Sequence, residues 1–209
     1  AYKYSLLFVV PMCIGLACFA APILRLLYFT NPAYVAGASA LAILAVGMTF
    51  YSIFSISTSI VQGIGNPRIP MYILIFGAVI TAVLNWLMVP SLGIAGGAAA
   101  TSIACFAMMV PILYFVFKLT KVKAPKISIF KIFIASMIMG IVACFIPKTT
   151  TWLFIGIIIC IIVYFFALIF VKFFTEEDIT SLKALFSKFG PLAKIMNKML
   201  DLVEKIEFR

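Results

Sequence analysis

The chain has 209 residues, of which 66% are hydrophobic and only 11% are charged, and its formal net charge is +10. A soluble domain carries roughly a quarter charged residues, so this composition excludes an ordinary soluble globular protein. The chain has no histidine, its five cysteines lie in apolar stretches without paired metal-type spacing, and all six acidic residues lie at or after Glu176, so familiar metal sites and acid–base pairs cannot be assembled from it. We predict a polytopic membrane protein that is not an enzyme and needs no cofactor.

Six apolar stretches follow one another along the chain. About 20 residues suffice for a helix to cross the hydrocarbon layer, and each of the six stretches has close to that length or more. They are residues 4–28, 34–63, 69–90, 93–117, 129–147 and 152–171. The sequence therefore predicts an all-α bundle of six transmembrane helices. The second stretch is long for the layer, so we expect it to tilt or to begin outside it.

Lysine and arginine are distributed unevenly between the predicted loops. If the N-terminus is cytoplasmic, only Arg25 and Lys148 lie on the outer side, and the other fourteen of the sixteen basic residues lie on the inner side. This bias is the positive-inside signal. We expect a multi-pass protein of the cell (cytoplasmic) membrane with both termini in the cytoplasm. The positive charge is then a topology signal, and we predict no nucleic-acid partner.

Of the prolines within the predicted spans, Pro22 and Pro90 lie close to span ends, whereas Pro11 and Pro111 lie nearer the span interiors. Proline removes a backbone hydrogen bond and kinks a helix. The two interior positions are therefore hinge candidates, with a static kink as the alternative.

The second stretch carries a polar stripe. Tyr51, Ser55, Thr58 and Gln62 recur at i, i+4, i+7 and i+11, which places them on one helix face. In hydrocarbon such groups seek the bundle interior, where they line a cavity or bond to a neighbouring helix. The alternative is that the hydroxyls bond to carbonyls of their own preceding turn. Asn85 in the third stretch cannot satisfy its side-chain amide on its own preceding turn in the way that a hydroxyl can. It is a candidate for either interhelical hydrogen bonding or a ligand contact.

The stretch "SLGIAGGAAATSIA" (residues 91–104) is almost without side-chain bulk. Helices in lipid associate by close packing, which small residues permit. We expect another helix to lie against its backbone, and the alternative to a static interface is a sliding surface in a protein that changes shape. The helix-packing candidates are Gly93, Gly96, Gly97, Ala100 and Ala104.

Three segments in this order carry a family resemblance. They are "LACFAAPILRLLYFTNPAYVAGASALAILAVG" (residues 16–47), "VQGIGNPRIP" (61–70) and "LNWLMVPSLGIAGGAAATSIA" (84–104). Together they resemble the C-terminal half of polysaccharide biosynthesis flippases. These are the O-antigen-type members of the multidrug/oligosaccharidyl-lipid/polysaccharide exporter superfamily. The resemblance covers roughly residues 1–115.

The resemblance implies two six-helix lobes that rock about a central cavity. It implies that residues 1–117 are four helices of the C-terminal lobe, that 118–128 are a basic cytoplasmic loop, and that 129–171 are two additional transmembrane helices. The N-terminal lobe of the same protein is then missing and is an expected partner, together with membrane lipids. The expected substrate is a lipid-linked oligosaccharide or polysaccharide precursor, with a drug or metabolite exporter as the alternative. A third reading is a non-transporting scaffold or an unrelated transporter.

Arg25 is the cation that this topology places at the outer end of a lobe helix. Its guanidinium is a candidate partner for a substrate phosphate, and the alternative is that it snorkels to the outer headgroups.

The segment from Thr175 onward has alternating apolar and basic residues, interrupted at Gly190-Pro191. We expect residues 175–209 to form an amphipathic cytoplasmic tail on the inner membrane surface. The alternative is a helix pair that binds a partner protein.

Overall fold

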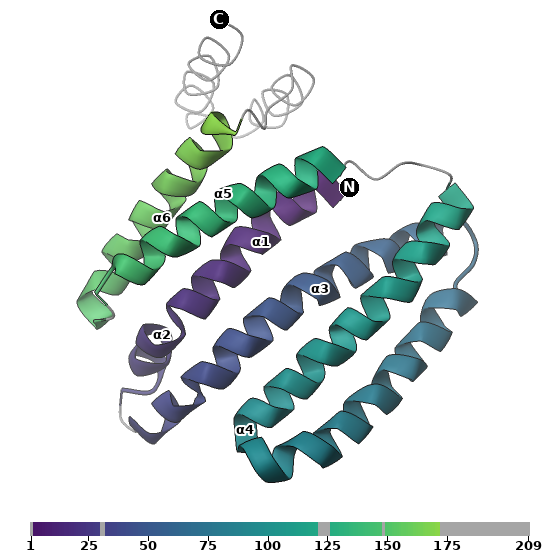
Figure 1. Cartoon of the computed structure of the whole chain (residues 1–209), viewed down its shortest axis with the longest axis horizontal. Helices are drawn as coiled ribbons and strands as arrows, with labels where there is room; N and C mark the ends of the chain where they lie inside the picture. Colours follow the sequence, from purple (N-terminus) through teal and green to yellow (C-terminus); the bar gives the residue numbers. More distant parts are fainter. Residues whose placement is uncertain (1, 30–31, 121–125, 148, 172–209) are drawn as a thin grey trace, which may run out of the picture.

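The computed structural model describes residues 2–29, 32–120, 126–147 and 149–171, and every structural statement below concerns these residues. The predicted tail, 175–209, and residues 121–125 of the predicted basic loop lie outside them. The elements are α1 (Tyr2–Cys18), α2 (Ala20–Leu27), the short 3-10 helix η1 (Pro32–Gly37), α3 (Ala38–Gly63), α4 (Arg68–Thr120), α5 (Lys126–Phe145) and α6 (Thr150–Phe170). Figure 1 shows α3 between α1 and α4, with α5 and α6 on the other side of α1.

The helix α4 consists of two legs that fold back on each other. Its backbone leaves the helical region at Gly93, where φ is 59° and ψ is −137°. Glycine adopts this conformation readily because it has no Cβ. Beyond the bend the second leg returns along the first (Figure 1). Met108 of the second leg lies directly against Gly77 of the first. The two legs correspond to the predicted stretches 69–90 and 93–117.

The first predicted span is built from two helices. α1 and α2 meet at Phe19 and are bent by 74° relative to each other. Pro22 has no N–H, so it cannot make the helical bond to the residue four positions earlier. The bend therefore lies where the hydrogen-bond ladder is interrupted.

Among the described residues, three helical segments are long and apolar enough to cross a membrane: Ala33–Gly63, Arg68–Thr120 and Trp152–Phe170. The bent pair α1–α2 would make a fourth, and Ile129–Phe145 is a shorter apolar helix. The predicted all-α membrane fold is confirmed at this level. The number of six spans stays a prediction.

The turn between α3 and α4 follows from its sequence, Gln-Gly-Ile-Gly-Asn-Pro-Arg. Gly65 has a φ of 86°, its N–H donates to the Gln62 carbonyl at 2.9 Å, and the Asn66 N–H donates to the Val61 carbonyl at 3.2 Å. These two bonds form a Schellman motif, which ends a helix with a glycine in the left-handed region. Pro67 then stands at the start of α4, where a missing N–H costs nothing.

Three apolar clusters hold the helices together. The first joins α1 to α5 and α6, with Leu6, Val10 and Ala135 among its buried members. The second joins α3 to both legs of α4 around Phe54 and Ile112. The third packs the α1–α2 junction on α5 and α6, and its members are Phe19, Met139, Ala143, Ile146, Leu153 and Cys160. Because α1 also packs on α3, it links the α3–α4 unit to the α5–α6 pair.

Candidate functional site

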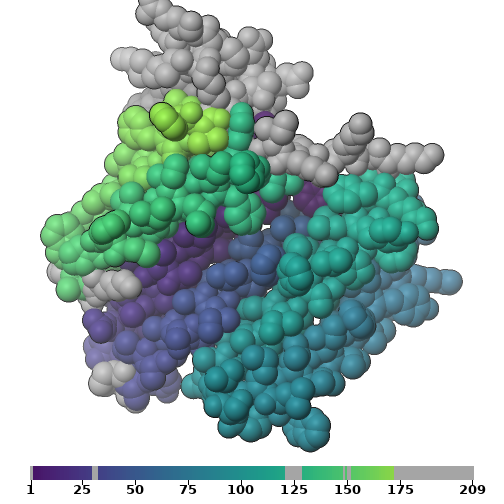
Figure 2. All heavy atoms as spheres, in the orientation of Figure 1, coloured from purple at the N-terminus to yellow at the C-terminus, as the bar shows by residue number. Residues whose placement is uncertain are grey.

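The predicted polar stripe lies on a face of α3 that its neighbours leave partly open. Phe54 and Val61 on another face are buried against α4, and Ser57 accepts or donates a 2.6 Å hydrogen bond with the Tyr2 hydroxyl of α1. Three stripe residues are exposed and Thr58 is half-buried; the exposed ones are Tyr51, Ser55 and Gln62. Figure 2 shows α1 and α3 together as a band between the α5–α6 pair and α4.

The hydroxyls of α3 divide into two groups. Ser52 donates to the Met48 carbonyl at 2.8 Å and Ser59 to the Ser55 carbonyl at 3.1 Å, so both are satisfied within their own helix. The Thr58 Oγ1 atom is buried and has no hydrogen-bond partner within the described part of the chain. A buried polar atom without a partner is costly. Thr58 is therefore the stripe residue whose buried hydroxyl lacks a partner among the described residues.

Asn85 lies in the first leg of α4 and is half-buried. Its Oδ1 atom is 3.4 Å from the position that a Cβ on Gly97 would occupy, so the amide stands at the contact between the two legs. This placement fits a bond between helical legs as well as a ligand contact, and both predictions stay open.

Arg25 stands in the last turn of α2 and is exposed. A cation there interacts favourably with the carbonyl end of the helix. Tyr28 beyond it stacks on Tyr34 of η1, with ring centroids 4.6 Å apart, so α2 ends beside the entry to α3. The polar stripe begins at Tyr51, thirteen residues into α3, which at a rise of 1.5 Å per residue is about 20 Å along the helix. Arg25 and the stripe thus lie at different depths of the bundle.

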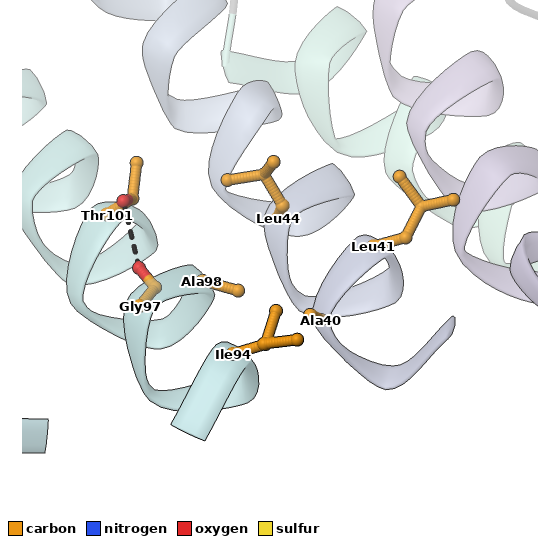
Figure 3. Close-up of a pocket in the computed structure, with 7 residues that line it drawn as sticks. All are labelled: Ala40, Leu41, Leu44, Ile94, Gly97, Ala98 and Thr101. Carbon is orange, nitrogen blue, oxygen red and sulfur yellow. Dashed lines mark hydrogen bonds between the residues drawn. The ribbon is translucent and has the colours of Figure 1, made fainter. Parts of the chain in front are cut away.

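An apolar groove, which the sequence did not predict, lies between the first turns of α3 and the beginning of the second leg of α4 (Figure 3). Its volume is about 390 Å³, and it is lined by Ala40, Leu41, Leu44, Ile94, Gly97, Ala98 and Thr101. The Thr101 hydroxyl donates its proton to the Gly97 carbonyl at 2.9 Å, so that proton is already used within the helix. Leu44 precedes Tyr51 by two helical turns, so the groove continues the face of α3 that carries the stripe. Small residues on both helices are the sequence signal for it.

The small residues of α4 have different surroundings. Ala100 and Ala104 are fully buried, and Gly96 lies against the Met88 carbonyl across the bend. Gly97 makes only ordinary contacts, and Gly93 has no atom within 4 Å of its Cβ position and stands at the bend itself.

In the part of the chain that the structure describes, apolar helices pack side by side and three or four of them are able to cross a membrane, which defines a multi-pass helical membrane protein. More particularly, the chain belongs to the lipid II flippase MurJ family, whose model matches residues 1–171. This family is part of the exporter superfamily that the sequence resembles, and its members are transporters rather than catalysts.

Two relatives come from Methanocaldococcus jannaschii. The chain is 30% identical to the uncharacterised membrane protein MJ1068 over 187 residues, which are 86% of this chain and 36% of that protein. It is 33% identical to the uncharacterised membrane protein MJ1375 over 108 residues, which are 52% of this chain and 25% of that protein. The chain thus spans about a third or less of the curated relatives it matches. No solved structure matches it significantly.

Proposed function

We propose that the chain is part of a transporter that moves a lipid-linked oligosaccharide or polysaccharide precursor from the inner to the outer leaflet of the cell membrane, for cell-surface polysaccharide biosynthesis. The observation that carries this proposal is the match of the lipid II flippase family to residues 1–171, because these residues contain all the predicted spans. A flippase makes and breaks no covalent bond. This agrees with a segment, residues 1–175, that contains no aspartate, glutamate or histidine.

We assign a separate role to each predicted part of the chain. Residues 1–117 are four helices of a C-terminal lobe of the O-antigen type, and residues 129–171 are an additional helix pair. Alternating access requires two bodies that move about a central site. We therefore propose that another lobe of the same protein completes the cavity, and that this chain by itself inserts into the membrane without transporting.

The head of the substrate carries sugars and phosphate, so it needs hydroxyl, amide and cationic partners. On this chain the candidates are Arg25, Asn85 and the α3 stripe. Thr58 supports the proposal best, because its buried hydroxyl has no partner among the described residues. Arg25 is exposed at the end of α2, which fits a role at the outer mouth of the cavity.

The test is a leaflet-resolved assay of the lipid-linked glycan in cells that lack other flippases. Full-length protein should carry the glycan to the outer leaflet. Arg25→Ala should lower the rate without lowering membrane abundance, and Arg25→Lys should recover part of it, because the charge is kept while the bidentate fork is lost. If the full-length protein leaves the glycan inside but reduces the accumulation of cationic dyes, the drug-exporter alternative is correct.

A further inference from the structure

A tyrosine of α6 binds a backbone carbonyl of α1. The Tyr164 hydroxyl donates to the Leu7 carbonyl oxygen at 2.7 Å. In an uninterrupted helix that carbonyl would accept the N–H of residue 11, four positions later. Residue 11 is Pro11, which stands inside α1 and has no N–H. Tyr164 therefore supplies the donor that Pro11 removes.

The surroundings of this bond are apolar. Tyr164 packs against the cluster that joins α1, α5 and α6, in which Leu7 is 7% exposed and Ala135 and Ile132 are fully buried. Water has little access there, so the alternative for the Leu7 carbonyl is to remain unsatisfied, which is costly in such surroundings. Ser136 of α5 is close enough to interact electrostatically with the Tyr164 hydroxyl, yet its buried Oγ has no partner of hydrogen-bond geometry within the described residues. The contact of the Tyr164 hydroxyl that has the distance and direction of a hydrogen bond is therefore the one with the Leu7 carbonyl.

The helix α1, which carries the Leu7 carbonyl, lies between the α3–α4 unit and the α5–α6 pair. On one side α1 packs on α3, where Tyr2 bonds to Ser57, and on the other side it packs on α5. The additional helices thus reach the α3–α4 unit mainly through α1 and α2. Helices in lipid associate by close packing and by interhelical hydrogen bonds, and a hydrogen bond is directional, so it adds a constraint on their register.

We propose that Tyr164 is a latch that holds α6 in register on α1 at the carbonyl freed by Pro11, so that the α5–α6 pair moves with α1 as one body. Pro11 leaves the Leu7 carbonyl without its helical donor, and Tyr164 replaces that donor from α6. This inference does not depend on which substrate is transported, so it fails or holds independently of the proposed function.

The test is a double-mutant cycle in the full-length protein reconstituted in nanodiscs. Tyr164→Phe removes only the hydroxyl, and Pro11→Ala returns the N–H that Leu7 needs. Spin labels are placed on cysteines at Met12 of α1 and Phe170 of α6, which are 72% and 86% exposed, in a background without the native cysteines. We measure the distance distribution between the labels and the midpoint of thermal unfolding.

With Pro11 present, Tyr164→Phe should lower the unfolding midpoint and broaden the distance distribution, with the ratio of latched to unlatched protein falling roughly three- to twentyfold. In the Pro11→Ala background, the same change should have a clearly smaller effect on both. The control is Tyr114→Phe in α4. Tyr114 is 61% exposed, so this change should leave both measurements unchanged. Equal effects of Tyr164→Phe in the two backgrounds, or an unchanged distance distribution with Pro11 present, would overturn the proposal.

Discussion

Ser102 of α4 lies directly against Gly47 of α3. A Cβ built on Gly47 would stand 2.8 Å from the Cα of Ser102. At the same place the Ser102 hydroxyl is within 3.0 Å of the Ile43 carbonyl of α3 and 2.9 Å of the Ala98 carbonyl of its own helix. The two helix backbones thus approach each other where one helix has no side chain and the other has a small polar one, as is common between membrane helices.

The first prediction concerns this contact. Gly47→Ala places a methyl group against backbone atoms that cannot rotate away, so α3 and α4 must separate. We expect a loss of about 1–3 kcal/mol of stability, measured as a lower midpoint of thermal unfolding in detergent. Gly15→Ala in α1 is the matched control, because its Cβ position has no neighbour within 4 Å. Equal midpoints for the two variants would contradict the close contact.

Two adjacent glycines of α4 should respond differently to the same substitution. A Cβ on Gly96 would overlap the Met88 carbonyl group, whose carbon is 2.7 Å away, whereas a Cβ on Gly97 would make ordinary contacts of 3.4 Å with Asn85 and 3.7 Å with Val89. We therefore expect Gly96→Ala to cost about 1–3 kcal/mol and Gly97→Ala to stay within about 0.5 kcal/mol of the parent. The measurement is again thermal unfolding, and a more severe effect at Gly97 would show that the two legs pack differently.

The bend of α4 should depend on Gly93. Alanine at a φ of 59° and ψ of −137° is strained, at a cost on the order of 1–3 kcal/mol, so Gly93→Ala should open the hairpin between the two legs. Cysteines at Gly77 and Met108 report this, because these residues touch across the hairpin. The disulfide between the two introduced cysteines should form readily when residue 93 is glycine and more slowly when it is alanine. Gly63→Ala, at a helical position with no neighbour within 4 Å, should leave the rate unchanged.

The topology prediction rests on charge alone. Five lysines lie between residues 118 and 131, and Lys148 lies in the following loop. Because positive residues are retained inside, an impermeant maleimide added to intact cells should label Lys148→Cys and not Lys123→Cys in a cysteine-free background. Permeabilised cells should give labelling at both sites. Labelling of position 123 in intact cells would invert the orientation.

Periodicity along the chain carried two predictions. The spacing of Tyr51, Ser55, Thr58 and Gln62 predicts a shared face of α3, and the small-residue stretch predicts close packing by the fourth span. The glycine, asparagine and proline after Gln62 have the residue types of a helix-ending turn, and the structure has such a turn there. These features depend on helical geometry and on local backbone preferences, which neighbouring residues determine.

The sequence by itself determined the all-helical membrane character of the chain, because hydropathy and the need to satisfy every backbone group in lipid leave few alternatives. Only the tertiary structure decided which surfaces meet. Spacing marks Gly96 and Gly97 alike, but of these two only Gly96 faces a backbone across the bend. The backbone of α4 lies directly against α3 at Ser102 and Gly47. Likewise Pro11 indicates a carbonyl without a donor, but not that Tyr164, far along the chain in α6, supplies one. Such pairings depend on how helices that are distant in the sequence pack on one another, and the residue spacing within a single helix does not encode this packing.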